Sequence, residues 1–212
     1  MPIIATVQQK GGVGKSTLAG NLAAELLSLG HRVAVVDADP QHTLLTWAGL
    51  GDGVLAHITR ALDATKPRQF MAEVEALAAK VDRVVLDAPP GLRDAALLAA
   101  LVADVVLLPC GPSPFDLVAA RQALDLVREA QAQRGGPPKI FLVPCRVTPT
   151  TTLGRDFPAT LAELGEAVLP PIAQRAVVAQ VALTGQTVAE AAQQTPAGAE
   201  FRALAEALEK AL

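Results

Sequence analysis

A segment rich in glycine and lysine near the start of the chain, KGGVGKST at residues 10–17, constrains the fold more than any other feature. It follows the apolar run 3–8 and opens an Ala/Leu-rich stretch, 15–29, that we expect to be helical. A strand, a glycine-rich turn and a helix in this order are the context of a phosphate-binding loop. A glycine-rich turn that binds nothing is the alternative. It does not account for Gly-Lys-Ser standing in register after an apolar strand.

The residue types of this loop suit a nucleotide with Mg²⁺. Its glycines let the backbone curl so that successive N–H groups point at phosphate oxygens, and the helix start adds its dipole. Lys15 can reach the β- and γ-phosphates, and the Ser16 hydroxyl suits Mg²⁺. We therefore expect these residues to bind the nucleotide: Lys10, Gly11, Gly12, Val13, Gly14, Lys15, Ser16 and Thr17.

The rest of the chain alternates between short β-branched runs and longer Ala/Leu-rich segments. Continuously apolar strands that alternate with helices predict an α/β fold of the P-loop NTPase type, with a mostly parallel twisted sheet and helices on both faces. Expected strands are 3–8, 32–37, 83–87, 105–109, 139–143 and 167–169, and expected helices are 15–29, 69–80, 93–102, 115–133, 151–164 and 197–212. Without a repeat, a low-complexity tail or a long linker, residues 1–212 are expected to form a single domain.

Acidic residues end two of the expected strands. Asp37 and Asp39 close the run VAVVDADPQ, and Asp87 closes VVLDAPPG. A phosphate loop needs carboxylates at neighbouring strand ends to hold Mg²⁺ and its waters. An aspartate at a strand end is often only a helix cap or a turn residue. These stretches therefore indicate a catalytic site only in combination with the phosphate loop.

One departure from the ordinary phosphate loop points to a family. The pattern G-x-x-x-x-G-K-[ST] would place its first glycine at position 9, where this chain has Gln9, and Lys10 follows. KGGVGKST resembles the deviant Walker A box of the ParA/MinD superfamily, and DADPQ and VVLDAPP resemble its other signatures. The likeness covers nearly the whole chain, is loose after residue 91, and lies nearest the small plasmid-type ParA partition proteins that lack an autorepressor domain.

This resemblance implies an ATPase whose MgATP is sandwiched in a homodimer. Lys10 would act in trans on the nucleotide of the other subunit, although a solvated loop lysine is the plain alternative. Lys10, Lys15 and Asp39 would be catalytic, with Asp39 orienting the attacking water. Ser16, Asp39 and Asp87 would serve the metal, and Asp37 would bond the phosphate loop.

The base site follows the family pattern less closely. Relatives carry an Asn-Arg pair near adenine, whereas this chain has Cys145 followed by Arg146. Arg146 and backbone near Pro170 and Pro171 are the expected base contacts. The choice of ATP over GTP rests on the resemblance alone.

The same resemblance implies a DNA-partitioning or cargo-positioning ATPase, cytoplasmic and associated with the nucleoid. A ParB-like or cargo-adaptor partner would stimulate slow hydrolysis, and the motifs leave the cargo open. A net charge of −3 gives no global attraction to DNA, so non-specific DNA binding needs a local basic patch. Candidates are Arg146, Arg155, Arg175, Arg202 and Lys210, each of which could equally be an ordinary surface charge.

Two other readings stay open at this point. A MinD-like membrane ATPase would use the C-terminal stripe Phe201, Leu204, Leu208 and Leu212, but its polar face carries more acids than bases, so we expect the stripe to pack on the domain and no membrane to be bound. A metabolic or redox enzyme on the same scaffold would need substrate or cluster residues beyond Cys110 and Cys145. Reduced thiols are expected, and a disulfide is left open.

Overall fold

The sheet places the first strand at its centre and joins all its strands in parallel. A computed structural model describes residues 2–212. Its eight-stranded sheet runs in the order β3-β2-β4-β1-β5-β6-β7, with β8 paired to β6. The strands are β1 Ile3–Thr6, β2 Val33–Asp37, β3 Thr59–Ala61, β4 Arg83–Asp87, β5 Val105–Cys110, β6 Lys139–Val147, β7 Ala167–Val168 and β8 Ile172–Ala173. The α/β fold with a parallel sheet is thus confirmed, and the carboxyl ends of β1, β2 and β4 meet at one edge.

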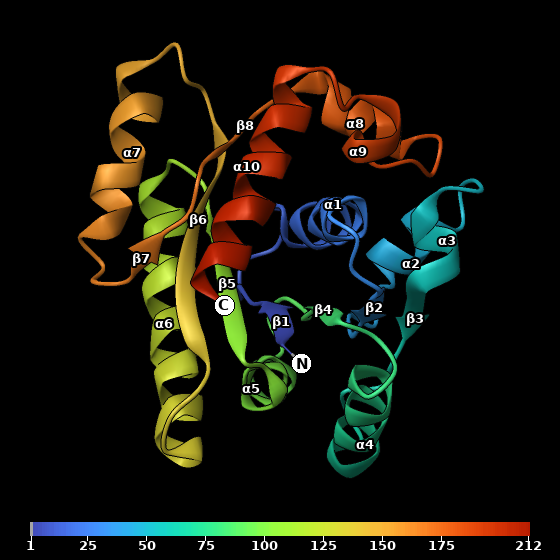
Figure 1. Cartoon of the computed structure of the whole chain (residues 1–212). Helices are drawn as coiled ribbons and strands as arrows, with labels where there is room; N and C mark the ends of the chain where they lie inside the picture. Colours follow the sequence, from blue (N-terminus) through green and yellow to red (C-terminus); the bar gives the residue numbers. More distant parts are fainter. Residues whose placement is uncertain (1) are drawn as a thin grey trace.

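Helices cover both faces of this sheet, as Figure 1 shows for α1 and α10 on one side and α5 on the other. One buried cluster joins the strands to α4, α5, α6 and α7, and a second joins them to α1, α2 and α10. The helices are α1 Lys15–Ser28, α2 Thr43–Ala48, α3 Val54–Ile58, α4 Pro67–Ala78, α5 Arg93–Val102, α6 Pro114–Arg134, α7 Thr152–Ala162, α8 Ala176–Ala182, α9 Val188–Ala191 and α10 Pro196–Ala211.

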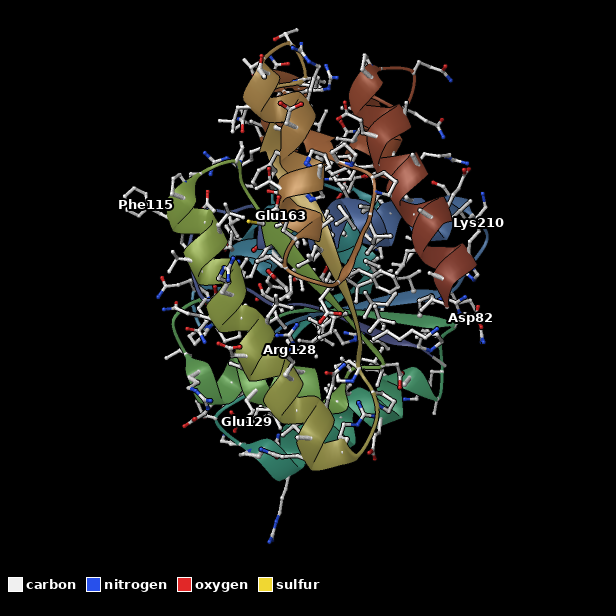
Figure 2. The ribbon with its side chains drawn as sticks, turned by 90° about the vertical axis from the view of Figure 1, so that its left-hand side faces the viewer. Asp82, Phe115, Arg128, Glu129, Glu163 and Lys210 are labelled. Atoms are coloured by element: carbon white, nitrogen blue, oxygen red, sulfur yellow. The ribbon has the colours of Figure 1, made fainter. Side chains whose placement is uncertain are left out.

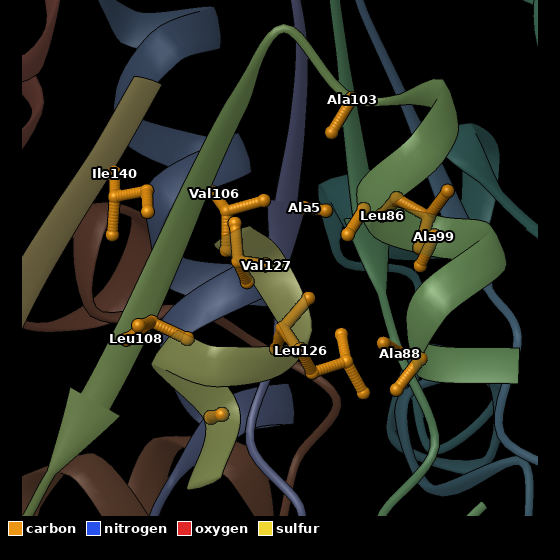
Figure 3. Packing of buried hydrophobic residues seen from close by; sticks show 14 of the residues in the cluster. Ala5, Leu86, Ala88, Ala99, Ala103, Val106, Leu108, Leu126, Val127 and Ile140 are labelled. Atoms are coloured by element: carbon orange, nitrogen blue, oxygen red, sulfur yellow. The ribbon is translucent and has the colours of Figure 1, made fainter. Parts of the chain in front are cut away.

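The core under α5 and α6 depends on small helix residues against large strand residues. Leu86 of β4 and Val106 and Leu108 of β5 are fully buried, and they face the helices in Figure 3. Ala99 of α5 is also fully buried, and its short side chain lets the helix approach the sheet closely. Each buried aliphatic side chain of this size contributes about 1.5–3 kcal/mol. This packing gives the site at the strand ends a rigid base.

Helix α10 contains most of the C-terminal apolar stripe. Phe201, Leu204 and Leu208 are at most 1% exposed and pack against α1, so the stripe belongs to the core, as expected. Its expected fourth member, Leu212, lies beyond the helix and stays 37% exposed. Within residues 2–212, no helix combines the length and the apolar character needed to span a membrane.

The long elements lie close to their expected ranges, and β4 and α5 match them at both ends. The elements that sequence reasoning missed are all short: β3, β8, α2, α3, α8 and α9. None of them extends beyond 7 residues, which is too short to establish a hydrophobic period. They form because tertiary contacts hold them.

Candidate active site

The phosphate loop is an open cradle of backbone. Gly12 and Gly14 have φ angles of 75° and 104°, a left-handed conformation that favours glycine. A Cβ added at Gly11, Gly12 or Gly14 would meet no heavy atom within 4 Å. Gly14 is the N-cap of α1 and makes no side-chain cap, so the first N–H groups of this helix have no capping side chain. A phosphate group fits this arrangement.

Lys15 lies beneath the cradle and is only 6% exposed. Burial lowers the pKa of its ammonium, and the carboxylates of Asp87 and Asp39 oppose that effect. A buried cation next to an open anion cradle would gain free energy from a polyphosphate in contact with it. The surroundings of Lys15 therefore fit a nucleotide.

Asp87 carries an oxygen that the described residues leave without a partner. Thr6 Oγ1 donates to Asp87 Oδ1 at 3.0 Å, across the register that pairs β1 with β4, while Oδ2 is buried and unbonded. Burial raises the pKa of Asp87 to about 6, against the opposing effects of Ser16, Lys15 and Thr6. A buried carboxylate oxygen close to the Ser16 hydroxyl fits a hydrated Mg²⁺.

Asp37 does not bond the phosphate loop, and this expectation was wrong. Its Oδ1 accepts from the backbone N–H of Asp39 at 3.0 Å, and its Oδ2 accepts from that of Leu45 at 2.9 Å. Asp37 thus fixes the turn after β2 and satisfies a backbone donor in the first turn of α2. Asp39 is 8% exposed and accepts from Gln41 N–H at 2.9 Å. The turn therefore holds Asp39 close enough to Lys15 for their charges to interact.

Lys10 is bound within its own chain by a residue that sequence reasoning missed. Its Nζ lies 2.5 Å from Asp116 Oδ1, and its side chain is 41% exposed. Ser113 Oγ donates to the other Asp116 oxygen at 2.9 Å and also caps α6. The sequence Ser-Pro-Phe-Asp at 113–116 has the form of a helix start, but nothing local indicates a contact across 106 residues.

A pocket of about 300 Å³ adjoins the loop on the side where a base would lie. Arg146 lines this pocket, has its backbone at φ 57°, and donates to Gly12 O at 2.6 Å and Gln174 Oε1 at 3.2 Å. Pro170 is not among the lining residues and borders a separate hollow with Pro149 and Pro171. Because β8 pairs with β6, residues 172–175 line the base pocket where Pro170 was expected. The pocket is lined by Gly12, Val13, Gly14, Thr17, Leu18, Trp47, Cys145, Arg146, Ile172, Ala173, Gln174, Arg175, Val178, Ala179, Ala182 and Phe201.

The two cysteines lie on neighbouring strands but on opposite faces of the sheet. Cys110 packs in the cluster with α5 and α6, whereas Cys145 packs in the cluster with α1 and α10. Both thiols are free and buried, and burial raises the pKa of each to about 12. The described part of the chain holds no group of three His, Cys, Asp or Glu side chains that could bind a metal ion. The two thiols are not joined in a disulfide.

The five basic residues considered for DNA binding do not gather in one patch. Arg175 pairs with Glu200 at 2.6 Å, and Arg202 pairs with the buried Glu25 at 3.2 Å. Lys210 lies in the last turn of α10, and the neighbouring Glu209 binds Arg83 at the start of β4. This end of α10 is therefore at the amino edge of the sheet, opposite the phosphate loop.

Arg146 and Arg175 both line the pocket beside the loop, and Arg155 lies in α7. Arg155 lies exposed in α7, where its guanidinium donates to Thr150 O and Thr152 Oγ1 at 3.4 and 3.3 Å. Arg146 is also exposed but is held by the loop itself. Of the four arginines, Arg146 and Arg155 form no ion pair within residues 2–212, whereas Arg175 and Arg202 are held by glutamates.

Comparison with known proteins assigns this arrangement to a family. Residues 4–188 match the family described as the CobQ/CobB/MinD/ParA nucleotide binding domain. The chain belongs to this family. In keeping with this family and with the partitioning ATPase reported below, it is an ATPase.

Two curated relatives extend over most of the chain. It is 33% identical to maintenance of carboxysome distribution protein A of Halothiobacillus neapolitanus, over 87% of this chain and 85% of that protein. It is also 33% identical to the chromosome-partitioning ATPase Soj of Thermus thermophilus, over 96% of this chain and 93% of that protein. Among solved structures, a Cyanothece McdA variant in complex with ATP superposes with a TM-score of 0.81 at 18% identity, covering 100% of this chain and 96% of that one. The last likeness concerns the fold.

Proposed function

We propose that this chain is a cargo-positioning ATPase that dimerises when it binds MgATP. The observation that carries the proposal is Lys10, a second cation that stands beside a complete phosphate site and is 41% exposed. Lys15 is already buried within the cradle. An additional lysine outside it can reach a nucleotide held by another copy. The relatives named for distributing carboxysomes and partitioning chromosomes support the same class of work.

Different residues of the site would bind the phosphates, hold the metal ion and assist hydrolysis. The amides of residues 11–16 and Lys15 would hold the phosphates, and Ser16 and Asp87 would hold Mg²⁺ with its waters. When bound, Mg²⁺ neutralises charge on the transferring phosphoryl group. Asp39 would orient the attacking water, and Lys10 would add positive charge as the leaving oxygen becomes negative.

We also propose that residues 1–212 act as one ATPase domain, because all described strands belong to connected sheet pairings. The ATP-bound dimer would bind DNA without sequence preference, associate with the nucleoid, and be released when a ParB-like or cargo-adaptor partner stimulates hydrolysis. Arg155 and Arg146 are the preferred DNA contacts, since Arg175 and Arg202 are held in ion pairs. The membrane-bound alternative loses its support because the stripe of α10 is buried.

Dimerisation is tested by measuring mass in solution with MgATP, with MgADP and without nucleotide. A dimer with MgATP alone is expected. Lys10→Ala should keep nucleotide affinity within about threefold but lose the dimer or most of the hydrolysis. Lys66→Ala is the matched control, because Lys66 is also exposed and paired with an aspartate, Asp63. Hydrolysis and dimerisation unchanged in Lys10→Ala would refute the role in trans.

DNA binding is tested by fluorescence anisotropy with arbitrary duplexes under the same three conditions. Binding is expected with MgATP only and should weaken steeply as salt rises, because the contacts are to phosphates. Arg155→Ala should weaken it, whereas Arg128→Ala should not, since Arg128 is held by Glu166 on the exposed face of α6 (Figure 2). Equal binding with MgADP, or none with MgATP at low salt, would contradict the proposal.

A further inference from the structure

Helix α2 connects the base pocket to the turn that holds Asp39. The helix has only 6 residues, too few to be stable by itself, so contacts at its two ends set its position. At its start, Leu45 N–H donates to Asp37 Oδ2 at 2.9 Å, and the other oxygen of this carboxylate accepts from Asp39 N–H at 3.0 Å. His42 N–H also donates to Asp39 O at 2.8 Å, directly before the helix. The position of Asp39 therefore depends on the position of α2.

At the other end of α2, Trp47 is held from two sides. Its Nε1 group donates to Gln186 O at 3.2 Å, in the segment that follows α8. Its ring packs against α1 at Gly20, where an added Cβ would lie 2.5 Å from the indole carbon Cζ3 (Figure 1 shows α2 beside α1). A larger residue at position 20 would displace the ring. The ring also lines the base pocket, so α2 has one end at this pocket and the other at Asp39.

We propose that Trp47 is a positioning residue for hydrolysis, which holds Asp39 in its productive place only when a nucleobase fills the pocket. This inference rests on the proposed function, in which Asp39 orients the attacking water. A base in contact with the indole ring removes the free space into which the ring and α2 can shift. Because α2 and Asp39 share the carboxylate of Asp37, a fixed helix also fixes Asp39.

The phosphates alone cannot supply this contact, because the cradle of residues 11–16 and the wall formed by Trp47 meet different parts of a nucleotide. Tripolyphosphate has the three phosphates of ATP but neither ribose nor base, so it would fill the cradle and leave the base pocket empty. Contacts with a part of the substrate remote from the reaction can raise kcat as well as affinity. ATP should therefore be hydrolysed faster than tripolyphosphate even when both saturate the site.

The test measures phosphate release from MgATP and from magnesium tripolyphosphate, each at saturation, in the unmodified chain and in Trp47→Phe. Phenylalanine keeps an aromatic ring at the pocket but lacks the N–H group that binds Gln186. The unmodified chain should hydrolyse ATP about tenfold faster than tripolyphosphate or more, and Trp47→Phe should bring the two rates within about twofold. A tenfold effect on kcat is the size expected for one hydrogen bond. The KM of Trp47→Phe for ATP should stay within about threefold.

Asp37→Asn breaks the same connection at its other end. The asparagine side chain has one acceptor oxygen, so it cannot accept from both Leu45 N–H and Asp39 N–H, and the preference for ATP should again be lost. Leu50→Ser is the matched control, because Leu50 directly follows the C-cap of α2 but is 54% exposed and does not line the pocket. It should keep the full preference. Circular dichroism melts establish that each variant is folded.

Asp39→Ala separates this inference from the function beneath it. If Asp39→Ala hydrolyses ATP at the unmodified rate, the proposed role of Asp39 fails and the role of Trp47 fails with it. If Asp39→Ala is inactive but a folded Trp47→Phe or Asp37→Asn protein keeps the full preference for ATP, the positioning role alone is overturned. A Trp47→Phe protein with a raised KM and an unchanged kcat would also overturn it and would make Trp47 a base contact only.

Discussion

At the residue scale, the site contains charges that burial disfavours. Lys15 has a lowered pKa and Asp87 a raised one, and both effects come mainly from desolvation. Groups held in this way destabilise the folded protein until a ligand pairs with them, so a site ready for its ligand costs stability. MgATP brings the opposite charge to each of them.

Asp87→Asn should therefore stabilise the nucleotide-free protein at neutral pH. The pKa of Asp87 is about 6 in the folded chain and 3.8 in the reference state, so the folded chain binds the proton more tightly. Stability of the unmodified protein should fall as pH rises from about 4 to 6 and stay lower above that range. The asparagine keeps an acceptor for Thr6 without the charge, and the shift in pKa corresponds to a gain of up to about 3 kcal/mol at pH 7.5.

Urea unfolding of both proteins in EDTA, from pH 4 to 8, measures this difference. It should shrink toward zero near pH 4, and Mg²⁺-dependent hydrolysis should be lost in the variant. A variant that is less stable than the unmodified chain at pH 7.5, or a gain that does not change with pH, would contradict the assignment of buried charge to Asp87.

At the element scale, α10 is anchored by a partly buried ion pair as well as by its apolar face. Glu25 of α1 is fully buried, and Arg202 binds its Oε2 at 3.2 Å while Oε1 stays unbonded. Burial raises the pKa of Glu25, and Arg202 opposes that rise. Arg202, which the sequence analysis named as a candidate DNA contact, therefore has a structural role as the partner of Glu25.

Arg202→Ala should destabilise the fold by about 2–3 kcal/mol, because it leaves a buried carboxyl group without its partner. Arg128→Ala, which breaks the exposed pair with Glu166, should cost no more than about 1 kcal/mol. Thermal unfolding followed by circular dichroism measures both. Equal stability of the two variants would mean that Glu25 does not depend on Arg202.

At the scale of the whole molecule, sequence patterns predicted those features that depend on residues close together in the chain. The loop, the strands that end at Asp37 and Asp87, and the long helices follow from spacing and periodicity. The partner of Lys10 could not be predicted, since Asp116 is 106 residues away. Helix α2 could not be predicted either, because contacts of Asp37 and Trp47 hold it in place. The Trp47 Nε1 group donates to the backbone oxygen of Gln186, which lies far away in the sequence, at 3.2 Å.

Because the cradle, Lys15 and the pocket belong to one folded unit, nucleotide binding should stabilise the whole chain. MgATP at 100 times its dissociation constant should add about 2.7 kcal/mol, which is roughly 5–10 °C in melting temperature for a chain of this size. Lys15→Ala should remove most of this shift, and EDTA should reduce it in the unmodified protein. A shift of the same size in Lys15→Ala, measured by differential scanning fluorimetry, would place the nucleotide elsewhere.

The position of Trp47 has a practical consequence for all of these measurements. The chain has one tryptophan and no tyrosine, so its near-ultraviolet emission comes from a single ring. That ring is 8% exposed, borders the pocket beside the loop, and lies in the helix that follows Asp39. The unlabelled protein thus carries its own optical probe, which can follow arrival and departure of the nucleotide in a stopped-flow instrument.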